Sequence, residues 1–138
     1  MNRSIRNLNP GNIRKTGITW FGQSKVQDDK AFVVYTEARW GFRAIAKIFQ
    51  QYKLRGVDTI HELISAWAPP VENDTGAYAA FVAKNVGLGV NDKIDLEDIV
   101  TVVEICMAIA KFEGDTDGYF TRDMAIEGIQ PLFDRKTV

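Results

Sequence analysis

Glu113 is the residue whose type and position best suit acid chemistry. It follows a long apolar stretch with helical spacing and directly precedes Gly114, so it is predicted to end a helix. A carboxylate there faces the negative end of the helix dipole, and an apolar neighbour such as Phe112 disfavours charge further if the group is buried. Both effects favour the protonated form, which a general acid needs. The alternative is a solvated glutamate at a frayed helix end.

Glu37 and Glu72 are the candidate partner carboxylates for such an acid. Glu37 lies in the first turn of a predicted helix, where the dipole favours negative charge, so it is either an ordinary stabilising residue or an ionised partner. Glu72 begins the Glu-Asn-Asp-Thr segment that follows a Trp-Ala-Pro-Pro sequence. This segment either ends one helix and caps the next, or forms a rigid loop that presents polar groups to a ligand. The catalytic candidates are therefore Glu113, Glu37 and Glu72.

Aromatic and amide side chains could bind a sugar and its substituents. Aromatic faces can stack on sugar rings, and asparagine or tyrosine side chains can hydrogen-bond polar groups of a ligand. Aromatic residues at helical spacing also form cores, and Trp40 is expected to do so. The expected substrate-binding residues are Asn9, Asn12, Trp20, Tyr35, Trp67, Asn73 and Tyr78.

The single cysteine, the single histidine and an incomplete glycine motif exclude several other kinds of chemistry. Cys106 is the one cysteine, which excludes an internal disulfide and a multi-cysteine zinc site, and its apolar surroundings predict burial. His61 is the one histidine and leaves no pair for a metal. Gly87-Leu88-Gly89 lacks the Lys-Ser/Thr of a phosphate loop and the third glycine of a dinucleotide fingerprint. We therefore expect no metal and no cofactor.

Length and composition indicate one globular domain. The chain has 138 residues, is 46% hydrophobic and carries a net charge of −1, which excludes a disordered chain. Residues 1–27 hold five basic and no acidic side chains, a charge of +5, and residues 28–138 carry −6. The basic segment either meets an anionic partner or is a solvated arm. No helix-turn-helix or zinc signature indicates binding to nucleic acid.

The elements that must position these residues are mostly helices. Residues 1–35 contain turn chemistry at 9–12 and two β-prone runs at 18–21 and 31–35, which predict a hairpin with a long tip. Apolar residues at 3-4 spacing predict a helix from Thr36 to a stop at Gly56.

Capping residues mark the later helices. Thr59 and Glu62 form a capping box that begins a short helix ended by diproline. Asp74 or Thr75 is expected to cap the next helix, and Asp95 to cap the longest, over about 96–113. Thr121 is expected to cap a last helix that ends near Gly128.

The predicted fold is α+β and mainly helical. A small β-subdomain spans 1–35, a core of about five helices spans 36–128, and a frayed tail spans 129–138 of one domain, 1–138. A concave seam between the two parts is a usual place for a ligand.

Several segments of the chain form a recognisable set. They are Ile5 to Arg14 with its Asn-Pro-Gly-Asn-Ile-Arg sequence, Trp20-x-Gly22, Phe32-x-x-Tyr35, Gly41-Phe42-Arg43-Ala44, Trp67-Ala68-Pro69-Pro70-x-Glu72-Asn73-Asp74-Thr75-x-x-Tyr78, and Phe112-Glu113-Gly114. Together they resemble a phage and prophage protein family whose members are often described as virion structural proteins and look lysozyme-like. The resemblance covers about residues 5–128. Members tend to read His-Glu-Asn-Gly where this chain reads Phe-Glu-Gly-Asp at 112–115.

A more distant resemblance suggests a mechanism. Residues 7–14 are similar to a segment of glucosaminidase-type cell-wall hydrolases, in which a helix that ends in a glutamate comes before this segment. Here the comparable helix end, at Glu113, comes after it. The resemblance therefore implies a circularly permuted lysozyme-like arrangement, with Glu113 in the position of the catalytic glutamate.

The two resemblances imply an enzyme that cleaves the glycan strand of peptidoglycan, as a muramidase, glucosaminidase or lytic transglycosylase. Glu113 would be the general acid, and the expected partners are peptidoglycan strands. The alternative is a non-catalytic virion protein that binds peptidoglycan or other virion proteins, which the Phe-Glu-Gly-Asp sequence favours.

The expected location follows from the absence of targeting segments. The first residues lack the apolar core of a signal peptide. The longest mostly apolar run, 99–112, contains Glu104 and Lys111 and is too short to cross a membrane. We expect synthesis in the host cytoplasm and action in the periplasm or cell wall, or carriage in the virion.

Overall fold

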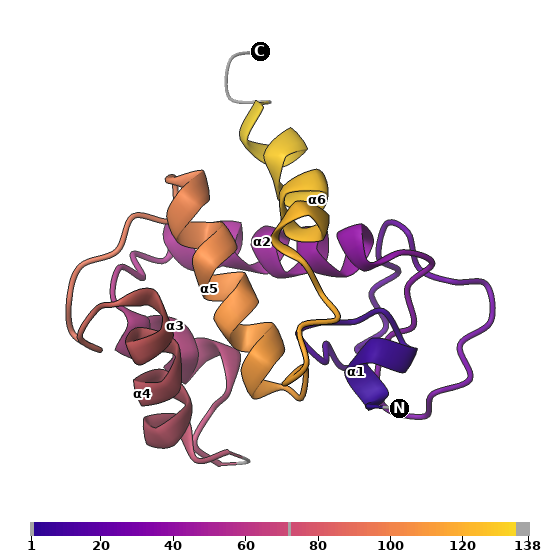
Figure 1. Ribbon diagram of the computed structural model, residues 1–138, viewed down its shortest axis with the longest axis horizontal. Coiled ribbons are helices and arrows are strands. Elements are labelled where there is room, and N and C mark those ends of the chain that lie inside the picture. The colour runs from indigo at the N-terminus through magenta and orange to yellow at the C-terminus, as the bar shows by residue number, and fades with distance from the viewer. Residues whose placement is uncertain (1, 72, 135–138) are drawn as a thin grey trace.

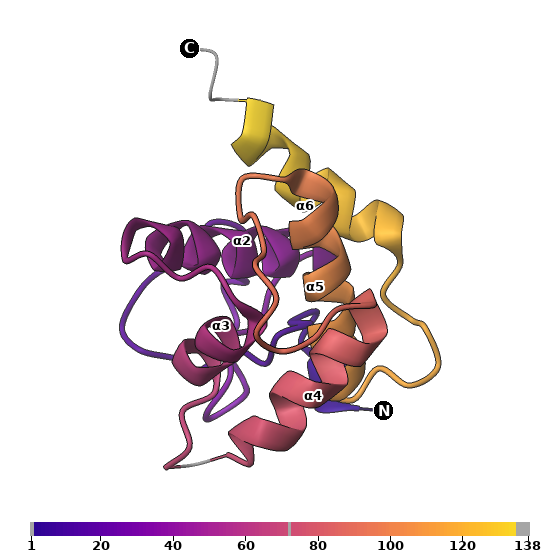
Figure 2. The same ribbon diagram turned by 90° about the vertical axis from the view of Figure 1, so that its left-hand side faces the viewer.

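The computed structural model describes residues 2–71 and 73–134, and this part of the chain is mainly helical, as predicted (Figure 1). Figures 1 and 2 show α3 and α4 together on one side of α2, with α6 on the other. The helices are α1 (Arg3–Arg6), α2 (Ala38–Leu54), α3 (Ile60–Trp67), α4 (Thr75–Val86), α5 (Ile99–Phe112) and α6 (Arg122–Asp134).

Most of the predicted helix starts are confirmed by their caps. The Thr59 side chain accepts a hydrogen bond from the Glu62 amide at 3.1 Å, and the Asp74 side chain accepts one from the Ala77 amide at 3.0 Å. At the other end of α4, Gly87 adopts a φ of 75°, which a residue without Cβ does at little cost. Local side-chain chemistry therefore predicts where these helices begin and end.

The prediction for the start of α5 was wrong by three residues. Asp98, not Asp95, is the cap of this helix, and its side chain accepts from the Val100 amide. Asp95 instead holds the preceding turn by accepting from the Glu97 amide at 2.8 Å. Both aspartates can satisfy free amide groups, so the capping preference alone does not choose between them.

Gly128 was predicted to end the last helix, but it lies inside α6, where it packs against α2. A Cβ at this position would lie 2.0 Å from the Arg39 carbonyl oxygen and 3.1 Å from the Arg43 nitrogen, so the backbones of α6 and α2 are in direct contact. Beyond it, Ile129 and Leu132 are buried in the core. Residues 129–134, predicted to be a frayed tail, are therefore helical, and the rest of that predicted tail lies outside the described residues.

The predicted N-terminal hairpin does not form. Within the described part of residues 1–35, the structure has the short helix α1 and no continuous strand. The runs 18–21 and 31–35 do not pair with each other. Their neighbourhood contains only isolated bridges, between Arg14 and Phe32 and between Gln23 and Tyr35.

Side-chain hydrogen bonds supplement the few backbone bonds of this region. The buried Asn9 amide donates to the carbonyl oxygens of Ile13 and Val33, at 3.0 and 2.9 Å, and accepts from the Ile13 amide. Gln27 donates to the Val34 carbonyl oxygen and accepts from the Val34 amide. These local bonds satisfy backbone groups that a sheet would otherwise pair, so an extended segment exists without a sheet.

Asp29 neutralises part of the basic N-terminal segment. Its buried carboxylate accepts two hydrogen bonds from Arg3, at 2.6 and 2.7 Å, one from Asn7 at 2.9 Å and one from Arg6 at 3.3 Å. The Arg3 guanidinium is the main reason that the pKa of Asp29 lies far below its ordinary value. The segment is therefore folded onto an internal acid rather than being a free solvated arm.

Candidate functional site

A cleft of about 630 Å³ lies between the N-terminal segment and the helices. It is formed by the loops of the first 35 residues, one face of α2, the end of α3 with the loop that follows, and the end of α5. Its lining residues are Gly11, Asn12, Ile13, Arg14, Thr16, Ile18, Trp20, Phe32, Lys47, Ile48, Gln51, Tyr52, Trp67, Ala68, Pro69, Asn73 and Glu113.

The Glu113 carboxyl lies in this cleft and is held by two donors. Glu113 is the C-terminal cap of α5, and its amide donates to the Ile109 carbonyl oxygen at 2.9 Å. The Asn12 side-chain amide donates to Oε1 at 3.0 Å, and the Tyr78 hydroxyl donates to Oε2 at 2.7 Å. One donor comes from the N-terminal loop and the other from α4, so tertiary structure orients the carboxyl group.

Tyr78 continues this hydrogen-bond network beneath the cleft. Its ring is buried and stacks on Phe112, and its hydroxyl accepts from the Trp67 indole at 3.1 Å. Burial, and then the charge of Glu113, raise the pKa of Tyr78 far above its ordinary value. The phenol therefore keeps its proton and remains a donor to Glu113.

Asn12 is held in an unusual backbone conformation. Its φ is 47°, in the left-handed region that asparagine tolerates better than most residues. The preceding Gly11 is pressed against the Trp67 ring, since a Cβ there would lie 2.8 Å from Cζ2. Asn12 Oδ1 is buried and has no hydrogen-bond partner among residues 2–71 and 73–134. Asn12 therefore lines the cleft with its side-chain nitrogen bonded to Glu113 and its side-chain oxygen covered by the protein.

The end of α5 is packed against the start of the chain. Gly114 has a φ of 135°, and a Cβ there would lie 2.1 Å from the side chain of Asn2. Asn2 caps α1 by accepting from the Ser4 amide at 2.9 Å. The position of Glu113 is therefore set by a close contact between the N-terminal residues and the loop that follows α5.

The predicted substrate-binding residues divide into three groups. Asn12, Trp20, Trp67 and Asn73 line the cleft. Tyr78 lies behind it, in contact with Glu113. Asn9 and Tyr35 do not belong to the site, since both are buried and outside the lining.

The buried positions of Asn9 and Tyr35 correct the prediction that they bind a ligand. Asn9 has no exposed surface, and its side chain is used by the backbone of Ile13 and Val33. Tyr35 is 2% exposed, and burial raises the pKa of its hydroxyl above the ordinary value. Both are framework residues.

The candidate partner carboxylates are not both in the site. Glu37 lies outside the cleft lining at the start of α2, where its side chain is 56% exposed and pairs with Arg39 at 3.0 Å. The structure therefore does not place Glu37 with Glu113 in the lining of the cleft. Glu72 lies outside the described residues, and its neighbour Asn73 lines the cleft.

Sequence reasoning missed the contribution of α2 to the cleft. Lys47, Ile48, Gln51 and Tyr52 face it, and Arg14 lines it from the N-terminal loop. The i, i+4 spacing of Lys47 and Gln51 places them on one helix face, but such a pair usually marks a solvated surface. No signal in the sequence distinguishes a helix face that lines a cleft from one that faces solvent.

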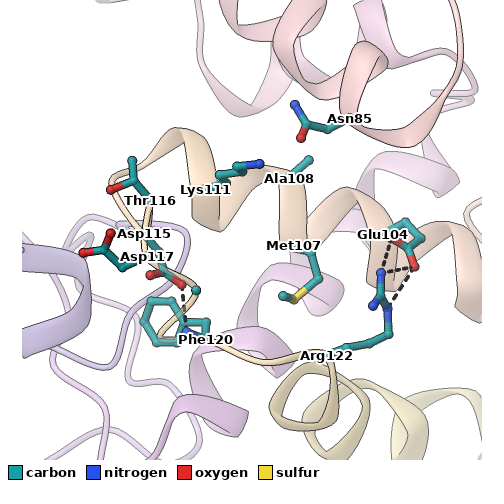
Figure 3. Close-up of a pocket in the computed structure, with 11 residues that line it drawn as sticks. Asn85, Glu104, Met107, Ala108, Lys111, Asp115, Thr116, Asp117, Phe120 and Arg122 are labelled. Atoms are coloured by element: carbon teal, nitrogen blue, oxygen red, sulfur yellow. Dashed lines mark hydrogen bonds and ion pairs between the residues drawn. The ribbon is translucent and has the colours of Figure 1, made fainter.

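A second hollow, of about 460 Å³, lies along α5 and the loop before α6 (Figure 3). Two of its acidic side chains, Glu104 and Asp115, make structural bonds. Glu104 pairs with Arg122 at 2.7 Å, and Asp115 accepts from the amides of Tyr119 and Phe120. It contains none of the predicted site residues.

Two further properties concern the part of the chain that the structure describes. No helix there combines the length and hydrophobicity needed to cross a membrane. No group of three or more histidine, cysteine, aspartate or glutamate side chains is placed to hold a metal ion.

Comparison with known proteins identifies a relative of this chain. No protein-family model matches it. It is similar to Protein P5 of Pseudoalteromonas phage PM2, with 35% identity over 105 residues. The match covers 73% of this chain and 66% of that protein, so the chain spans just under two thirds of the relative's length. By this similarity, the chain is a relative of a bacteriophage protein.

Proposed function

We propose that this protein cleaves the glycan strand of peptidoglycan, with Glu113 as the general acid. The observation that carries the proposal is a single carboxyl group at the end of α5, oriented by Asn12 and Tyr78 in the wall of a large cleft. Indole rings of Trp20 and Trp67 in the same lining suit the apolar faces of sugar rings. The fold that we propose is a circularly permuted lysozyme-like arrangement.

In the proposed reaction, Glu113 gives its proton to the oxygen that leaves as the glycosidic C–O bond breaks. The sugar then passes through an oxocarbenium-like state that a nucleophile must capture. A second carboxylate at about 5–5.5 Å would attack directly, and one at about 6.5–9.5 Å would activate water. Alternatively, the 6-hydroxyl of the muramyl residue attacks, returns a proton to Glu113 and leaves an anhydro sugar.

Glu72 is the proposed second carboxylate. Its neighbour Asn73 lines the cleft, with its amide donating to the Pro69 carbonyl oxygen at 3.2 Å. Glu72→Gln separates the two reaction types. If Glu72 takes part, this variant loses activity, whereas an anhydro product with full activity in the variant assigns the reaction to Glu113 alone.

The test of the main proposal is Glu113→Gln. Glutamine keeps the size of the side chain and removes the acid, so the variant is expected to fold and to release no soluble muropeptides from purified sacculi. Glu37→Gln is the matched control, because this exposed carboxylate lies outside the cleft. Release by Glu113→Gln at the wild-type rate would reject the assignment.

The second candidate function is a non-catalytic virion protein that binds peptidoglycan or another virion protein. It is favoured by the two internal hydrogen bonds on Glu113, which also suit a purely structural link between the end of α5, the N-terminal loop and α4. The relationship to a phage protein supports carriage in the virion. Sedimentation of the wild-type protein with sacculi, without release of muropeptides, would support this function over the enzyme.

A further inference from the structure

The charges of the cleft are the observation from which we infer a preferred ligand. Arg14 and Lys47 line it together with Glu113, the one carboxylate among the described lining residues. Arg14 comes from the N-terminal loop and Lys47 from α2, so two separate elements bring a cation to the same hollow. The whole chain carries a net charge of −1, so this local excess of positive charge is a property of the cleft.

Neither cation is used by the fold as an ion-pair partner. Arg3 and Arg6 in the same N-terminal segment pair with Asp29. In contrast, Arg14 and Lys47 form no ion pair within residues 2–71 and 73–134.

The Arg14 side chain is nevertheless held in position by an aromatic ring. Its guanidinium lies over the Phe32 ring, 4.9 Å from the ring centroid, and Phe32 also lines the cleft. A guanidinium supported by an aromatic face keeps its N–H donors for a carboxylate, which it can bind through two parallel hydrogen bonds.

We propose that Arg14 and Lys47 bind carboxylate groups on the ligand, so that the cleft takes a glycan bearing acidic peptides rather than a neutral one. This inference rests on the proposed function and specifies its substrate class. Peptidoglycan carries stem peptides with free carboxylates on its muramyl residues. Chitin has a related N-acetylated backbone with no acidic group.

The test measures binding, so that it does not depend on cleavage. The Glu113→Gln protein is sedimented with purified sacculi and with the same sacculi after their carboxyl groups have been capped as amides. Capping is expected to weaken binding about ten-fold. Arg14→Gln or Lys47→Gln, added to Glu113→Gln, is expected to weaken binding to untreated sacculi about three-fold each, as for partly exposed ion pairs.

The control is Lys84→Gln, which removes an exposed positive charge on α4, outside the cleft. It is expected to leave binding unchanged. Equal binding of the Glu113→Gln protein to capped and untreated sacculi would overturn the inference, as would equal losses in the Arg14, Lys47 and Lys84 variants. Capping leaves the protein unaltered, so this arm stands even if an arginine variant folds poorly.

Cleavage assays distinguish failure of this inference from failure of the proposed function. If wild-type protein releases fragments from sacculi and from soluble glycol chitin with the same KM, the enzyme proposal survives and the charge preference does not. If carboxylate-dependent binding is found without any release, the binding inference survives and the enzyme proposal does not.

Discussion

The side chains of Asn12 and Glu113, separated by 101 positions in the chain, are joined by a hydrogen bond of 3.0 Å. This bond connects the N-terminal loop to the end of α5 at the wall of the cleft. Tyr78 holds the other carboxylate oxygen from α4. Three distant parts of the chain thus meet at one functional group.

Asn12→Gly is expected to reduce cell-wall cleavage about ten-fold while costing about 1 to 2 kcal/mol of stability. Glycine keeps the positive φ of this position and removes only the amide that orients Glu113. The measurements are muropeptide release and urea unfolding. A variant with unchanged release would show that the Asn12–Glu113 bond serves the fold alone.

Tyr78→Phe is expected to destabilise the protein by about 1 to 3 kcal/mol, because it leaves the indole N–H of Trp67 without its acceptor and removes one of the two side-chain donors to Glu113. Thermal unfolding gives the stability, and muropeptide release gives the effect on Glu113. The matched control is Tyr119→Phe, since Tyr119 is 46% exposed. Equal losses of stability and of muropeptide release in the two variants would contradict a role of the Tyr78 hydroxyl in orienting Glu113.

Gly128→Ala is expected to cost about 3 kcal/mol, since its Cβ would overlap the Arg39 carbonyl oxygen and force α6 away from α2. Gly76→Ala, in the first turn of α4, meets nothing closer than 3.8 Å and is expected to be neutral or slightly stabilising. Urea denaturation of both variants measures the difference. A tolerated alanine at 128 would rule out direct backbone packing.

Asp29→Asn is expected to lower the melting temperature at pH 7. The folded-state pKa of Asp29 is depressed, so its stabilising effect is present above the ordinary value of about 3.9 and is lost as pH falls below it. The difference in melting temperature between wild type and variant should therefore shrink as the pH is lowered below about 4. Asp28→Asn, at an exposed neighbouring position, serves as the control. A difference that stays constant with pH would contradict this role.

Local patterns were enough to predict most of the helices. The capping side chains of Thr59 and Asp74 act within one turn of the residues that they cap, so their effect can be read from spacing. One prediction failed because a long-range contact overrides the local preference. Gly128 is a helix-ending residue by type, but packing against α2 carries the helix past it.

The β-prone runs of the first 35 residues show a second reason for failure. Their composition predicts strands, but Asn9 and Gln27 supply hydrogen bonds that strands would obtain from each other. Whether a side chain or a neighbouring strand satisfies a backbone group depends on three-dimensional placement. The spacing of residues in the sequence therefore does not predict which of the two partners a backbone group has.

The sequence by itself determined the residue types of the site: a glutamate at a helix end, a turn rich in asparagine, and a tryptophan before diproline. Only the tertiary structure decided which of them meet, because Asn12, Tyr78 and Glu113 come from separate elements. It also left Glu37 on the surface and brought Lys47 into the cleft. The physical reason is that a helix fixes its own register through local bonds, whereas a cleft depends on how several elements bury their apolar faces together.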